Sequence, residues 1–199
     1  GAETKRAAIL PPVPELPDLE VVKEYLNERI LGQPVVRAQV LRPTVLRLVA
    51  AQDFAGDVVG RRFGAISRRG KQLLIPLEPD RLLAINFMLT GRLQYCPPET
   101  KVERRTFFLL ATPEMELRYL DEQQMGIVYY VRPAQLSQVP RLEDVGPDAL
   151  ESHPAFEQFV QWLRPFRGEI KGILTKGVFL SGIGNAYSDE ILWAAKLHP

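Results

Sequence analysis

The sequence predicts an α+β fold: an antiparallel β-sandwich with one leading helix, followed by an all-helical domain. Short alternating or β-branched runs, broken by Gly and Pro, fill the first two thirds of the chain without helix-length patterns between them. One helical pattern precedes these runs, and only helical patterns follow Pro140. We therefore expect a tail at residues 1–13, the sandwich at 14–132, a linker at 133–150 and the start of a helical domain at 151–199.

The leading helix is predicted from Pro17 onward, and Gly32 supplies a stop signal. Its apolar residues recur at spacings of three and four, which places them on one face: Leu19, Val22, Leu26 and Ile30.

Strands are expected wherever a short run is bounded by turn residues. These runs are Val35–Leu41, Val58–Ser67, Gln72–Leu77, Leu82–Leu89, Thr106–Ala111, Met115–Tyr119 and Ile127–Val131. Their close spacing favours antiparallel pairing.

Three short helical patterns follow, at Pro154–Pro165, Glu169–Lys176 and Ala186–Lys196. They form a thin domain with little core of its own, so we expect the helical domain to continue beyond Pro199.

The composition is that of a globular protein, with 199 residues, 46% hydrophobic and 25% charged. It excludes a disordered tail or a collagen-like fibre. No apolar run approaches the ~20 residues that a membrane span needs. The single cysteine, Cys96, cannot form an internal disulfide or, alone, a structural zinc site. We expect a reducing cytosol as the compartment.

The net charge is only +1, but it is unevenly distributed. The segment 37–72 holds eight basic residues against Asp53 and Asp57, whereas 143–157 holds five carboxylates and no Lys or Arg. This pattern favours a protein with one basic face for a polyanion. Arginines that merely solvate one face of a sheet are the alternative.

Three motifs combine charge with local geometry. Pro14–Glu20 places three carboxylates at a helix start, where ordinary complements to the helix dipole are also found. Ser67–Lys71 is a basic loop in which Gly70 permits positive φ. In Gly182–Glu190, two glycines and Asn185 precede a helix, so N–H groups can face an anion such as a DNA phosphate. A plain helix N-cap is the alternative for this third motif.

These motifs, with Leu89-Thr90-Gly91 and His198-Pro199, resemble in order and spacing the formamidopyrimidine-DNA glycosylase / endonuclease VIII family. The resemblance covers nearly all of Pro14–Pro199. It implies a two-layer β-sandwich, then a helix-two-turn-helix domain, usually followed by a four-cysteine zinc finger. No cofactor is expected in this chain, and zinc only if such a finger follows Pro199. The implied partner is damaged double-stranded DNA, and we expect a cytoplasmic, nucleoid-associated monomer that binds no membrane.

The resemblance also implies a DNA glycosylase with abasic-site lyase activity. Such enzymes flip a damaged base out of the duplex, and an N-terminal proline amine attacks the sugar to form a Schiff base. By position, Pro14 is the nucleophile and Glu15 the general acid/base. Phosphate contacts are expected from Lys71 and Asn185, with Lys171 and Tyr187 as further candidates, and Leu89 is expected to fill the space left by the flipped base.

The sequence departs from the family pattern at Pro14, whose nitrogen lies in the amide bond to Val13. An amide nitrogen cannot form the Schiff base. Either this is a silent relative, or residues 1–13 are absent from the mature protein because translation starts at Val13. We favour the second interpretation. The alternative function is a lesion-binding protein of the same fold without catalysis.

A second departure affects recognition of the DNA, and a third lies at Asn86. Gln123 replaces an arginine that reads the orphaned partner base, and Met125 replaces a phenylalanine wedge. Asn86 stands where a histidine is common. These departures indicate a divergent branch of the family.

Overall fold

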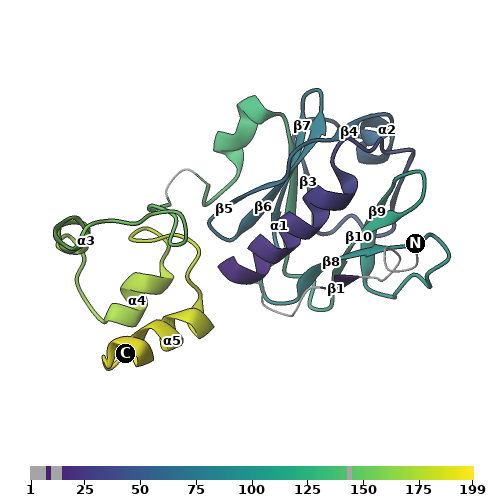
Figure 1. The fold of residues 1–199 in the computed structure, drawn as a ribbon. Helices are drawn as coiled ribbons and strands as arrows, with labels where there is room; N and C mark the ends of the chain where they lie inside the picture. The colour runs from purple at the N-terminus through teal and green to yellow at the C-terminus, as the bar shows by residue number, and fades with distance from the viewer. Residues whose placement is uncertain (1–7, 10–14, 143–144) are drawn as a thin grey trace.

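Two sheets and three packed helices form the two halves of the molecule in the computed structural model, which describes residues 8–9, 15–142 and 145–199 (Figure 1). The α+β order expected from the sequence is confirmed. The sheets and helix α1 (Leu16–Ile30) group together, while α3 (Phe156–Leu163), α4 (Ile170–Thr175) and α5 (Asn185–Ala195) lie beside them.

The first sheet contains five strands and the second six, and the described strand pairs are antiparallel except β3 with β11. The first runs in the order β1 (Ala8–Ile9), β8 (Gly91–Cys96), β10 (Glu116–Asp121), β9 (Thr106–Ala111), β2 (Arg37–Val40). The second runs β3 (Leu46–Leu48), β11 (Ile127–Val131), β7 (Arg81–Asn86), β6 (Gln72–Glu78), β4 (Arg62–Phe63), with β5 (Ser67–Arg69) also paired to β6.

The main core lies between the sheets and under α1. The four apolar residues predicted to line one face of this helix are all buried in it. Phe107, Phe108 and Tyr119 fill the centre, where the rings of Phe108 and Tyr119 stack with centroids 5.5 Å apart. Every residue of β9 and β10 is buried. Only β9 is a nearly continuous apolar run, because the buried residues of β10 include Glu116, Arg118 and Asp121.

The expected strand Val58–Ser67 is wrong. Residues Phe54–Val58 form the short helix α2, and Asp53 caps it by accepting the N–H of Gly56 at 3.1 Å. Only the two-residue strand β4 lies between this helix and β5. The buried apolar residues of α2, Phe54 and Val58, are four positions apart and therefore lie on the same face of this helix.

The expected strand Leu82–Leu89 ends early, at Asn86. The side-chain oxygen of Asn86 accepts the N–H of Met88 at 3.1 Å, and Met88 has φ +51°. This turn reverses the chain into β8, a strand that the sequence did not reveal because Arg92 and Gln94 interrupt its apolar residues.

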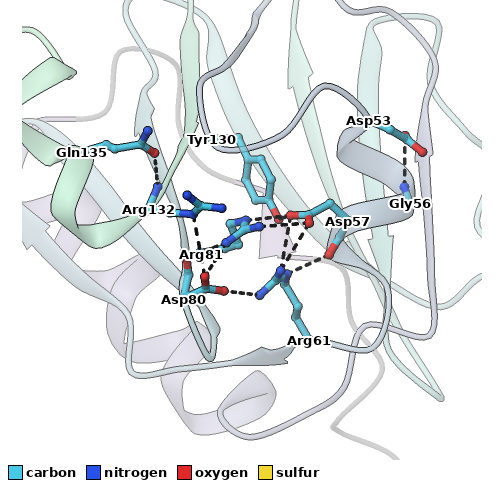
Figure 2. Close-up of polar contacts among 9 residues, drawn as sticks. All are labelled: Asp53, Gly56, Asp57, Arg61, Asp80, Arg81, Tyr130, Arg132 and Gln135. Carbon is cyan, nitrogen blue, oxygen red and sulfur yellow. Dashed lines mark hydrogen bonds and ion pairs between the residues drawn. The ribbon is translucent and has the colours of Figure 1, made fainter.

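A network of charged side chains and one tyrosine connects α2 to strands β7 and β11 of the second sheet (Figure 2). The Asp57 carboxylate accepts hydrogen bonds from Arg81 Nε (2.7 Å) and the Tyr130 hydroxyl (2.6 Å). Arg61 bridges Asp57 and Asp80. Burial alone would raise the pKa of Asp57, but the bonds from Arg81 and Tyr130 outweigh it and the pKa is lowered. Arg61, one of the eight basic residues of the 37–72 segment, is therefore neutralised in this network.

The helical half has its own small core. The residues fully buried in it come from α4, α5 and the segment between them: Ile173, Leu174, Phe179, Leu180, Ile183 and Leu192. The six-residue 3-10 helix η2 (Pro133–Gln138) leads from β11 toward this half. Of the helices in the described ranges, none has the length and apolarity to cross a bilayer.

Candidate active site

Glu15 connects the two halves of the molecule. It lies directly before α1 and is only 4% exposed. Its carboxylate accepts the backbone N–H groups of Gly184 (3.2 Å), Ala186 (3.0 Å) and Tyr187 (3.1 Å) at the start of α5. Helix N-termini bind anions through free N–H groups. The anion at this helix start is therefore the carboxylate of Glu15, rather than the phosphate expected from the sequence.

The two glycines before α5 allow this approach. A Cβ on Gly184 would lie 2.2 Å from Glu15 Oε1. A Cβ on Gly182, whose φ is +98°, would lie 2.3 Å from Leu16 Cδ1. Both distances are far below van der Waals contact, so the glycines make room for the start of α1.

A cleft of about 660 Å³ opens beside Glu15, between the sandwich and the helical half. Its wall includes four of the residues predicted to form the site: Glu15, Lys71, Leu89 and Asn185. Leu89 is 44% exposed and the Asn185 side chain is also accessible. Pro14, the expected nucleophile, lies outside the described residues.

Lys71 enters the cleft from the turn between β5 and β6. Gly70 makes this turn with φ +58°, and a Cβ there would lie 3.6 Å from Ser181 Cβ in the helical half. Burial lowers the pKa of the Lys71 amine, although the negative charge of Glu15 acts in the opposite direction. Across the described ranges, no carboxylate lies within 4.0 Å of its Nζ and no hydrogen bond engages it.

Arg68 joins the two halves of the molecule, and sequence reasoning did not single it out from its basic loop. Its side chain is 1% exposed and binds Glu20 of α1 through Nε at 2.6 Å. It also binds Asp148 of the helical half through Nη1 (2.5 Å) and Nη2 (3.0 Å). Opposite charge in the 37–72 and 143–157 segments was the signal available, because these two segments meet in this ion pair.

Asp121 joins the Leu89 loop to the loop at 122–126. This buried carboxylate accepts the Thr90 hydroxyl and the N–H groups of Gln123 (3.2 Å) and Gly126 (2.7 Å). Leu89, Gln123 and Met125 therefore belong to two connected loops, although only Leu89 lines the cleft.

Comparison with known proteins shows that two domain models of one protein family match this chain. The model of the formamidopyrimidine-DNA glycosylase N-terminal domain matches residues 13–128, and that of its H2TH domain matches residues 145–199. The chain belongs to the formamidopyrimidine-DNA glycosylase family.

Curated members of this family are similar along most of the chain. A formamidopyrimidine-DNA glycosylase of Desulforamulus reducens is 31% identical over 189 residues, covering 94% of this chain and 68% of the relative. One from Heliobacterium modesticaldum is 34% identical over 193 residues, with 94% and 69% covered.

Solved structures of one family member have the same fold. The formamidopyrimidine-DNA glycosylase of Lactococcus lactis, bound non-covalently to DNA with an abasic site, matches with a TM-score of 0.81 and 26% identity. The match covers 94% of this chain and 71% of that one. The same bacterial protein in complex with DNA that contains an oxidized pyrimidine matches equally well.

The remaining residues that the family resemblance suggested lie outside the cleft wall. Lys171 Nζ contacts Asp189 Oδ1 at 2.6 Å, so its charge is paired. Tyr187 is 38% exposed on α5. Gln123 and Met125 are exposed on their loop.

The zinc associated with the family has no fitting ligands in the described ranges of this chain. They contain no group of three or more His, Cys, Asp or Glu side chains that could hold a metal ion. Cys96 is fully buried in β8, and burial raises the pKa of its thiol.

Proposed function

We propose that this chain is a DNA repair glycosylase that removes a damaged base from double-stranded DNA and cleaves the resulting abasic site. One observation carries the proposal: Glu15, the residue after Pro14, is held by three N–H groups of the helical domain at the wall of the interdomain cleft. An acid/base group has to be fixed relative to the sugar in this way, because proton transfer needs hydrogen-bond distance.

The proposed chemistry uses the amine of Pro14 as a free amino terminus. Its nitrogen attacks C1′ of the damaged nucleotide while the bond from C1′ to the base breaks. Glu15 moves the protons of the sugar and the leaving base. The nitrogen lone pair then forms the C1′ iminium as the C1′–O4′ bond of the sugar ring breaks and O4′ takes up a proton. Loss of the C2′ proton, which the iminium makes acidic, forms a C2′–C3′ double bond and expels the 3′ phosphate with its electron pair.

The other predicted residues are proposed to bind the DNA around this centre. Lys71 and Asn185 contact phosphates beside the lesion, because the Lys71 amine and the exposed side-chain amide of Asn185 can both donate to phosphate oxygens. Leu89 fills the space of the flipped base. Gln123 and Met125 face the orphaned base, and the glutamine offers hydrogen bonds without charge.

The second candidate function is recognition of a DNA lesion without chemistry. The observation in its favour is the peptide bond between Val13 and Pro14, since an amide nitrogen has no basic lone pair. The fixed carboxylate of Glu15 argues against this second function, because a binding protein has no need of one.

Borohydride trapping on a duplex with one abasic site separates the two candidates. We expect a chain that begins at Pro14 to form a covalent adduct through the Pro14 nitrogen. On a duplex with a damaged base, Glu15→Gln in that chain is expected to abolish the adduct. DNA binding without an adduct from the chain that begins at Pro14 would instead support the lesion-binding function.

A further inference from the structure

The proline amine is blocked in the chain with thirteen residues before Pro14. The lone pair of its nitrogen is delocalised into the carbonyl of Val13. Part of the preceding segment is accommodated by the fold, because the backbone of Ala8 and Ile9 pairs with Tyr95 and Gln94 at the edge of the first sheet. Any Schiff base in this form of the protein requires another amine in the cleft.

Lys71 has the position that such an amine needs. It lines the same cleft as Glu15 and follows the β5–β6 turn, which contacts the helical half at Ser181. Within the part of the chain that the structure describes, its Nζ is bound to no carboxylate and no hydrogen-bond acceptor.

Lys71 also has the chemistry of a nucleophilic amine. Only an uncharged amine has a lone pair to attack a carbonyl carbon, and burial lowers the pKa of Lys71 toward that form. Desolvated lysines form Schiff bases for this reason.

Two lysines of the helical half are less suited than Lys71 to act as this amine. Lys171 is paired with Asp189 and does not line the cleft. Lys176 lines the cleft but is exposed to solvent, so it is not desolvated as Lys71 is.

We infer that Lys71 is a second Schiff-base nucleophile, which gives the chain abasic-site lyase activity while Pro14 is blocked. This inference rests on the proposed function, because it assumes the same cleft and an abasic site in DNA as substrate. In the form with Pro14 blocked, attack at C1′ takes the place of the phosphate contact proposed for Lys71.

The step begins on the open-chain aldehyde of the abasic sugar. The Nζ lone pair forms a bond to C1′ while the C1′–O π electrons move to oxygen, and loss of water leaves an iminium between C1′ and Nζ. Removal of the C2′ proton, which we assign to the Glu15 carboxylate, forms a C2′–C3′ double bond as the C3′–O bond breaks and the 3′ phosphate leaves with its electron pair. Water then hydrolyses the iminium, which restores the amine and releases an unsaturated aldehyde end.

The test is borohydride trapping of the chain that begins at Gly1 on a duplex with one abasic site, followed by peptide mapping of the adduct. We expect the adduct on Lys71. In Lys71→Arg, which keeps the positive charge but has no amine that can become neutral, we expect at least about tenfold less adduct with DNA binding retained. The matched control Lys176→Arg is expected to trap as the parent chain does.

Three results would overturn the inference: an adduct on the Gly1 amine, an adduct on Lys176, or no adduct while the DNA is bound. Loss of DNA binding in Lys71→Arg is resolved by the peptide map of the parent chain, which assigns the site without a variant. Trapping by a chain that begins at Pro14 distinguishes failure of this inference from failure of the proposed function. If the chain that begins at Pro14 forms an adduct and the chain that begins at Gly1 does not, only the role of Lys71 is refuted. If neither chain forms an adduct, the role of Lys71 and the proposed function are both refuted.

Discussion

Arg68 and Asp148 form a two-bond ion pair that fastens the β-sandwich to the helical half, with Nη1–Oδ2 at 2.5 Å and Nη2–Oδ1 at 3.0 Å. The backbone of Asp148 forms an isolated parallel β-bridge with that of Ser181, and Ser181 lies three residues before Gly184. Glu20, the second partner of Arg68, lies on α1 five residues after Glu15. The ion pair therefore supports both sides of the contact between Glu15 and the start of α5.

Removal of the Asp148 carboxylate is expected to destabilise the protein. Asp148→Ala leaves the buried guanidinium of Arg68 with Glu20 as its one carboxylate partner among the described residues, and breaking a buried pair on one side costs about 3 kcal/mol. Urea denaturation at neutral pH measures the change in the free energy of unfolding. Arg69→Met is the control, because Arg69 is exposed and such changes stay within about 0.5 kcal/mol. Equal stability of Asp148→Ala and Arg69→Met would contradict the role of the ion pair.

The same ion pair predicts a loss of stability in acid. Burial alone would raise the pKa of Asp148, but the hydrogen bonds from Arg68 and from the N–H of Leu150 outweigh it, so the pKa is lowered in the folded protein. A lowered folded-state pKa stabilises the fold above the unfolded-state pKa of about 3.9, and this contribution is lost as the pH falls through the folded value. The unfolding free energies of the parent chain and Asp148→Asn are therefore expected to differ at pH 7 and to converge as the pH falls through the lowered folded-state pKa of Asp148. A difference that is constant from neutral to acidic pH would refute this assignment.

The sequence predicted those parts of the fold in which local pattern and burial agree. The α1 face from Leu19 to Ile30 follows helical spacing, and β9 and β11 have the predicted bounds. Prediction failed where tertiary contacts override local preference. The segment 58–67 contains β-branched and basic residues, but Arg61 is held in a loop by the Asp57 and Asp80 carboxylates (Figure 2).

The candidate site was predictable in its residues but less so in its contacts. The cleft contains Glu15, Lys71, Leu89 and Asn185, each named from a motif. The partner of the α5 N-terminus could not be predicted, since Glu15 and Gly184 are 169 positions apart and only folding brings them together. Arg68 was hidden for a similar reason, because nothing in a basic loop reveals that one of its arginines is buried.

A methyl group at Gly184 is expected to reduce activity more than stability. The added Cβ of Gly184→Ala would lie 2.2 Å from Glu15 Oε1, so the carboxylate has to leave its three N–H partners. We expect trapping on a duplex with a damaged base by a chain that begins at Pro14 to fall at least about tenfold, because the acid/base group that assists loss of the base is misplaced.

Gly172→Ala is the matched control for this substitution. Gly172 lies in α4 with no atom within 4 Å of an added Cβ, and alanine in a helix interior is favoured by about 0.5–1 kcal/mol. Unchanged trapping in Gly172→Ala together with the loss in Gly184→Ala assigns the effect to Glu15. Normal trapping in Gly184→Ala would show that this carboxylate position is unnecessary.

Asp121 is expected to control both stability and recognition through the two loops that it joins. Asp121→Ala leaves the buried N–H of Gly126 and the Thr90 hydroxyl without their acceptor. An unpaired buried donor costs about 1–3 kcal/mol, which urea denaturation resolves. The loops that carry Leu89 and Gln123 also lose their common anchor, so we expect weaker preference for an abasic duplex over an intact one in competition binding.

Glu114→Ala separates these effects from a general loss of charge. Glu114 is an exposed carboxylate on the turn between β9 and β10, and it lies outside the two loops that Asp121 joins. We expect this variant to match the parent chain in unfolding free energy and in preference for the abasic duplex. Because the anchor acts by orientation, Asp121→Ala should reduce the preference for the abasic duplex while non-specific binding to intact DNA is kept. Equal weakening on both duplexes would show that Asp121 supports the fold alone and has no part in presenting Leu89 to the DNA.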